Sequence, residues 1–162
     1  MKPALFASVL ITAICSFPAG SFAGVTKLAA ADRQHLLQAK DAPLVTTMGE
    51  IPAEVVEACA AASSGGGFQL ADAGQPFQVT DVVTDKDLPA KRLIWAARIP
   101  GYMVVHYESG GIAHLYHVMV VALDSAKEAH VVWAAGAKPM KSYAEFREAL
   151  TSGKLDDSIP WH

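Results

Sequence analysis

The sequence predicts an α+β fold, in which an antiparallel meander sheet of four or five strands carries an N-terminal and a C-terminal helix packed on one face. Three observations support this class. Apolar segments between residues 92 and 135 are separated by turns so short that successive strands must pair antiparallel. Apolar residues recur at helical spacing over 52–62. A capping box stands near the C-terminus, with an apolar stripe behind it.

The expected strands are bounded by glycine, proline and polar residues, which favour turns. Gly110 and Gly111 are expected to form the tip of a tight hairpin. That tip would place Glu108 opposite Ala113 and His106 opposite Leu115. The strands are expected over 92–99, 102–108, 113–123 and 129–135, with one further short strand within 77–83.

The first helix is expected from Pro52 to Ala62. Proline suits the first helical turn, because its missing N–H is not needed there. Val55 and Cys59 belong to an apolar stripe that would face the core, and the serine and glycine run at 63–67 ends the helix.

The last helix is expected to begin after Ser142, because Ser142 and Glu145 have the spacing of a capping box. Gly153 follows the last apolar position and suits a helix end. The apolar stripe of this helix contains Tyr143, Phe146 and Leu150.

The chain begins with the features of a secretory signal peptide, which we assign to residues 1–23. Lys2 precedes an uncharged apolar run that is shorter than the roughly 20 residues needed to cross a bilayer, so no transmembrane anchor is expected after cleavage. We expect a leader at 24–45, either a short helix or a flexible segment. The single α+β domain then covers 46–153, and 154–162 forms a tail.

Cleavage after Ala23 would make the mature protein periplasmic or secreted. Cys15 is lost with the signal, so Cys59 remains alone and cannot form an internal disulfide. Loss of Lys2 changes the formal net charge from −3 to −4. The mature chain has no cluster of basic residues, which argues against nucleic acid as a partner.

The expected hairpin is the chemically densest segment of the chain. Its register would place His106, Glu108 and His117 on one face, where two imidazoles and a carboxylate are suitable ligands for zinc or an acid–base pair for catalysis. Arg98 on the neighbouring strand would add a cation for an anionic substrate. Secondary candidates on the other face are Tyr107, His114 and Tyr116.

Two alternatives limit that site. A three-residue loop would move side chains across the sheet and set His106 opposite His114. Polar side chains on the solvent side of a hairpin are also ordinary, and their spacing here matches no established metal motif.

Three functions are compatible with the sequence. The first is a small exported binding protein, such as an inhibitor or an immunity-type protein that acts on another envelope protein or binds a small ligand. The second is a small secreted hydrolase or metal-binding protein that uses His106, Glu108 and His117. The third is a structural module of an envelope assembly, which sequence alone does not separate from the first.

Overall fold

The computed structural model describes residues 27–63, 67–83, 85–124 and 128–155. The expected signal peptide and most of the expected tail lie outside these residues. The described chain has an α+β fold with an antiparallel sheet and with N-terminal and C-terminal helices, as the sequence predicts.

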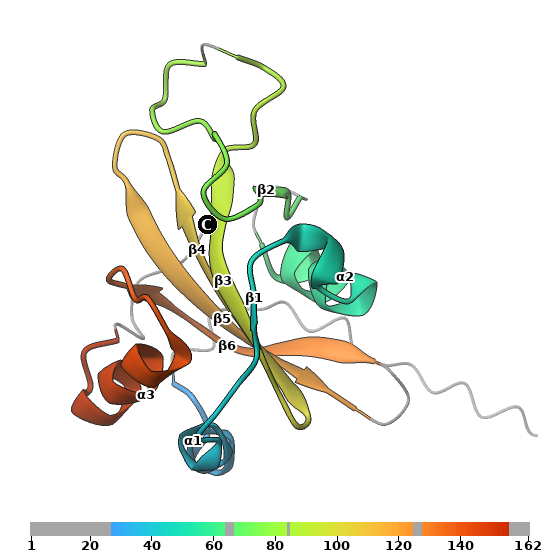
Figure 1. The fold of residues 1–162 in the computed structure, drawn as a ribbon, viewed down its shortest axis with the longest axis vertical. Coiled ribbons are helices and arrows are strands. Elements are labelled where there is room, and N and C mark those ends of the chain that lie inside the picture. Colours follow the sequence, from blue (N-terminus) through green and yellow to red (C-terminus); the bar gives the residue numbers. More distant parts are fainter. Residues whose placement is uncertain (1–26, 64–66, 84, 125–127, 156–162) are drawn as a thin grey trace, which may run out of the picture.

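The sheet is a meander extended on one side by two short strands (Figure 1). Its order is β1-β3-β4-β5-β6, and β2 joins the outer edge of β3 in parallel beyond the end of β1. Every consecutive pair from β3 to β6 is antiparallel, as short connections require. The strands are β1 (Leu44–Val45), β2 (Leu70–Ala71), β3 (Lys91–Ile99), β4 (Tyr102–Ser109), β5 (Leu115–Leu123) and β6 (Ala129–Ala137).

The connections differ from expectation at two places. The β4–β5 loop covers residues 110–114, so it is longer than the expected glycine tip. No strand forms within 77–83, because these residues belong to a long loop between β2 and β3 that lies above the end of the sheet (Figure 1). Three valines of that loop, Val79, Val82 and Val83, are exposed and contribute little to the core.

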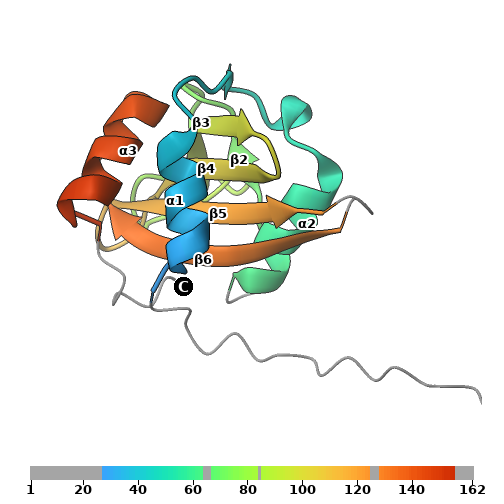
Figure 2. The same ribbon diagram turned by 90° about the horizontal axis from the view of Figure 1, so that it is seen from below.

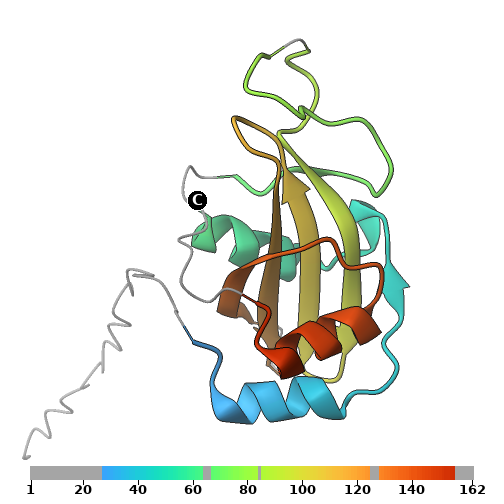
Figure 3. The ribbon, with the colours of Figure 1, turned by 90° about the vertical axis from the view of Figure 1, so that its left-hand side faces the viewer.

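The helices cover both faces of the sheet, which corrects the expectation that they share one face. The helices are α1 (Ala30–Gln38), α2 (Ala53–Ala62) and α3 (Tyr143–Ser152), with a 3-10 turn η1 at Met48–Glu50. Figure 3 shows α3 in front of the sheet and α2 behind it, and Figure 2 shows α1 on the side of α3. None of the helices in the described ranges is long and apolar enough to cross a membrane.

The burial of β4 explains this arrangement. Met103 and Val105 pack with α2, whereas Val104, between them in sequence, packs with α3. A strand whose two faces are both apolar requires cover on both sides, and its sequence is then a nearly continuous apolar run rather than an alternating one. Met103–Val105 is such a continuous apolar run, and it indicates a strand that is covered on both faces rather than on one.

Residues 27–45 of the expected leader pack onto the folded domain. Leu36 in α1 is fully buried, and its carbonyl accepts a hydrogen bond of 2.8 Å from the Tyr143 hydroxyl of α3. Arg33 of α1 also donates to the Leu150 carbonyl at 2.7 Å. The segment therefore closes one face of the sheet.

The last helix begins and ends as predicted. The Ser142 side chain accepts a hydrogen bond from the backbone N–H of Glu145, and Gly153 ends the helix in the left-handed conformation with φ 68°. The Glu145 carboxylate accepts from the N–H of Lys141 rather than from that of Ser142.

Replacing Leu36 by alanine tests whether α1 is part of the core. We expect Leu36→Ala to lower the free energy of unfolding by about 2–5 kcal/mol, because it leaves a cavity under a buried helix face. Urea unfolding measures the change. Gln34→Ala, at an exposed position of the same helix, is the control and should change stability by less than about 0.5 kcal/mol. Equal stability of both variants would return this segment to a loosely attached leader.

Candidate functional site

The register of the β4–β5 hairpin separates the three expected site residues. His106 lies opposite Val118, Tyr107 opposite His117 and Glu108 opposite Tyr116. This differs from the expected pairing by three positions, and an odd shift moves every side chain of one strand to the other face.

His117 consequently lies on the α2 face, whereas His106 and Glu108 lie on the face of α1 and α3. The three side chains do not converge. Within the described ranges, no three or more His, Cys, Asp or Glu side chains are grouped so as to hold a metal ion.

His106 is a buried structural residue. The Met140 N–H donates to its Nε2 at 3.1 Å, so Nδ1 carries the ring proton and donates to the His117 carbonyl at 2.8 Å. Trp95 donates from its indole N–H to the Met140 carbonyl at 2.7 Å. Burial lowers the pKa of His106, although the bond to the His117 carbonyl and the charge of Glu108 oppose this shift. Both ring nitrogens are satisfied, and together with Trp95 the ring fixes the connection that leads into α3.

Glu108 joins two strands and a loop through charged contacts. Its Oε1 accepts from Arg92 Nε at 2.6 Å, and its Oε2 lies 2.6 Å from His114 Nε2. The Glu108 side chain is only 7% exposed, against 28% for Arg92 and 38% for His114. Arg92 also donates to the Gln75 carbonyl at 3.1 Å, and its guanidinium lies 4.5 Å from the centre of the Phe77 ring. The cluster therefore connects the 72–90 loop to the sheet.

Arg92 belongs to this charged cluster, although the expected site did not include it. It lies opposite Glu108 because the register between β3 and β4 shifts between Leu93 and Trp95, where Ile94 forms a bulge. The sequence marks Lys91 and Arg92 as its densest basic spot, but the bulge that determines their partners has no clear signature there.

His117 occupies a different environment on the α2 face. Its Nε2 lies 2.9 Å from the Ser109 hydroxyl, and its ring stacks on Tyr107 with centroids 4.9 Å apart. Its Nδ1 is buried and has no hydrogen-bond partner. Burial lowers the pKa of His117 to about 4, and the charges of Lys91 and His106 add to that shift.

The other expected residues are dispersed. Arg98 is exposed near the opposite end of β3, where it donates to the Glu50 carbonyl at 3.0 Å. Tyr107 is buried on the α2 face. His114 and Tyr116 stack with centroids 4.9 Å apart and extend the Glu108 cluster.

The 72–90 loop is docked on the β4–β5 loop. The Gly111 N–H donates to the Val79 carbonyl at 3.2 Å, and the Gly110 N–H donates to the Ala90 carbonyl at 3.1 Å. A Cβ atom on Gly110 would stand 1.8 Å from the Gln78 carbonyl oxygen, so only glycine permits this approach. The two glycines hold a neighbouring loop, a role that the expected hairpin tip did not include.

Large exposed apolar side chains gather on these two loops. Ile112, in the β4–β5 loop, is 95% exposed. We call this set the apolar rim; it consists of Val79, Val82, Val83 and Ile112.

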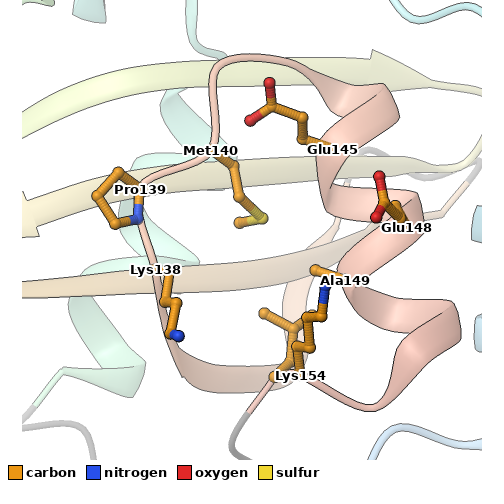
Figure 4. A pocket seen from close by; sticks show the side chains of 8 residues that line it. Lys138, Pro139, Met140, Glu145, Glu148, Ala149 and Lys154 are labelled. Carbon is orange, nitrogen blue, oxygen red and sulfur yellow. The ribbon is translucent and has the colours of Figure 1, made fainter.

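A separate hollow of about 180 Å³ lies between α3 and the segment before it (Figure 4). Met140 forms part of its wall, and charged side chains of both signs stand around it. None of the expected site residues lines it. The charged lining residues are Lys138, Glu145, Glu148 and Lys154.

Comparisons of the chain with protein-family models, with curated proteins and with solved structures gave no significant match.

The Glu108 cluster predicts a local effect of charge removal. We expect Glu108→Gln to lower the free energy of unfolding by about 1–3 kcal/mol, because a mostly buried partner of Arg92 loses its charge. Amide exchange at Gly111 should accelerate, since the 72–90 loop loses an anchor. Glu57→Gln, at an exposed site on α2, should alter neither quantity. Unchanged exchange at Gly111 would show that the glycines hold the loop without Glu108.

The two buried imidazoles predict a loss of stability in acid. Their pKa values are lower in the folded protein, so between about pH 6.5 and pH 4 the unfolded chain binds more protons. The two neutral imidazoles cost no stability above about pH 6.5, and the free energy of unfolding decreases as the pH falls through this range. His117 alone should account for about 3 kcal/mol at pH 4.

Urea unfolding at several pH values, compared between the wild type and His117→Gln, measures this contribution. The variant should show a smaller pH slope, whereas His130→Gln, at an exposed position of β6, should keep the wild-type slope. Identical slopes in all three proteins would contradict the assignment of a neutral buried His117.

Proposed function

We propose that the protein is a small exported binding protein that recognises another exported protein through the apolar rim, in the manner of an inhibitor or an immunity-type protein. The observation that carries this proposal is the exposure of Ile112. Its side chain is 95% exposed, although the loop that holds it is hydrogen-bonded to the 72–90 loop through Gly110 and Gly111. A large apolar side chain held almost wholly in water favours a partner that covers it.

The anchoring of the loops supports a binding role. The Gly111 N–H donates a hydrogen bond to the 72–90 loop. Arg92 fixes that loop to the sheet, because it donates to the Gln75 carbonyl and pairs with Glu108. A loop that is already ordered before binding loses little conformational entropy on association. Inhibitors commonly present such preorganised loops to the cleft of their target.

The export signal and the charge of the chain support the choice of partner. Cleavage after Ala23 would release the domain outside the cytoplasm, where its partners are other exported proteins. The mildly acidic chain, without a basic cluster, favours a protein or small-ligand partner over nucleic acid.

The hydrolase and metal-binding alternative depends on His106, Glu108 and His117 meeting in one site. The hairpin register separates His117 from the other two, and His106 has both ring nitrogens engaged by the backbone. The binding function therefore has the better support.

Substitutions in the apolar rim test the proposal. We expect the immobilised mature protein to retain an exported protein of the producing cells, and the purified partner to bind in a saturable manner by calorimetry. Ile112→Ser should weaken this binding at least tenfold, since a buried isoleucine contributes about 1.5–3 kcal/mol. Thermal stability should be unchanged, because the side chain makes little contact in the free protein.

Leu44→Ser is the matched control, because Leu44 is an exposed leucine on β1, away from the rim. It should leave the affinity unchanged. Equal affinity of Ile112→Ser and the wild type, or failure to retain any exported protein, would overturn the proposal.

A further inference from the structure

The α2 face of the hairpin end holds three polar side chains from three neighbouring strands. Lys91 of β3 lies directly opposite Ser109 of β4, and the Ser109 hydroxyl lies 2.9 Å from Nε2 of His117 on β5. Lys91 and Ser109 are partly exposed, whereas His117 is 6% exposed. The cluster is thus open to solvent at one end and closed at the other.

Two of these groups lack the partners that their burial requires. His117 Nδ1 is buried without a hydrogen bond, although buried ring nitrogens are ordinarily paired. Lys91 makes no ion pair with any described residue, and its ammonium instead lies 5.9 Å from the centre of the Phe68 ring. A half-buried cation and an unpaired imidazole nitrogen on the same face both favour an incoming group with acceptor atoms.

We propose that Lys91, Ser109 and His117 form a binding site for a ligand that carries a single carboxylate group. The ammonium of Lys91 pairs with the carboxylate. The Ser109 hydroxyl donates to Nε2 of His117, so the neutral imidazole carries its proton on Nδ1 and donates it to the ligand. The site lies on the face of the hairpin opposite to Glu108, and it does not depend on the apolar rim.

The charge of the site selects a monoanion. His117 is neutral near pH 7, because burial lowers its pKa to about 4, so Lys91 supplies the one positive charge. Cys59 and Tyr107 face the same region and stay uncharged, because burial raises the pKa of both. One cation balances a carboxylate, whereas a phosphate dianion would remain half unpaired in a partly desolvated site.

Aromatic side chains form the walls of the site. Phe68 packs edge-on against Tyr107 at 5.2 Å, and Tyr107 stacks on the ring of His117. These rings reduce the water around Lys91, which strengthens its attraction for an anion. Burial lowers the pKa of Lys91, as expected for an ammonium without a paired carboxylate.

Titration with sodium acetate tests the site. The imidazole nitrogen resonances of His117 are followed by NMR in the mature protein, with chloride adjusted to hold the ionic strength constant. We expect a saturable shift with a dissociation constant in the millimolar range. Inorganic phosphate should bind at least tenfold more weakly than acetate.

Lys91→Met removes the charge and keeps an apolar stem over Phe68, and it should weaken acetate binding about tenfold or more. Its thermal stability should be at least that of the wild type, because a half-buried cation without a partner is removed. Lys138→Met, which removes the same charge at an exposed site near α3, should bind acetate normally.

Three results would overturn the proposal: the absence of a saturable shift at His117, equal affinity of Lys91→Met and the wild type, or phosphate binding as tight as that of acetate. Each can occur while Ile112→Ser still weakens protein binding, so failure of this site is distinguishable from failure of the proposed function.

Discussion

The register between β3 and β4 is the constraint on which the arrangement of charged side chains at the β4–β5 loop end of the sheet depends. From Ile99 back to Trp95 the strands pair in one register, and the bulge at Ile94 changes it by one residue. If Ile94 were instead paired regularly with β4, Arg92 would face α2 and Lys91 would face α1 and α3. The bulge therefore places the guanidinium against Glu108 and the ammonium beside Ser109. A single irregular residue assigns each of two adjacent cations to its own face of the sheet.

Cover on both faces of the sheet has a consequence for its polar residues. A polar side chain on a solvent-facing sheet needs no fixed partner, but one under a helix must be paired. His106 meets this requirement through two backbone groups distant in sequence, and with Trp95 it holds Met140 at the entrance to α3. Histidine in this strand is thus explained by the connection that it secures rather than by chemistry at a surface.

The sequence predicted the elements better than their arrangement. Strand and helix positions follow largely from local patterns, and the structure confirms the predicted helix start after Ser142 and the helix end at Gly153. The geometry of the candidate site depends on one loop length, and the β4–β5 loop is longer than the sequence predicts. Gly110 makes a close contact with the 72–90 loop instead of forming the tip of a tight turn. That contact joins segments far apart in sequence, so no local pattern near Gly110 reveals it. His114, which the expected register places on the opposite face from Glu108, contacts Glu108 because the loop is longer.

The two faces of the hairpin end differ in how completely their polar groups are satisfied, and this difference separates scaffold from site. Glu108 has a partner at each carboxylate oxygen, so its cluster is complete and serves to hold the 72–90 loop. On the other face, His117 keeps an unpaired nitrogen beside a half-buried lysine. A folded protein retains such unpaired groups against a stability cost of about 1–3 kcal/mol for each buried group. That cost is offset when a ligand supplies the missing partner. A ligand bound on the α2 face, beside His117, is therefore expected to raise the free energy of unfolding more than one bound beside Glu108.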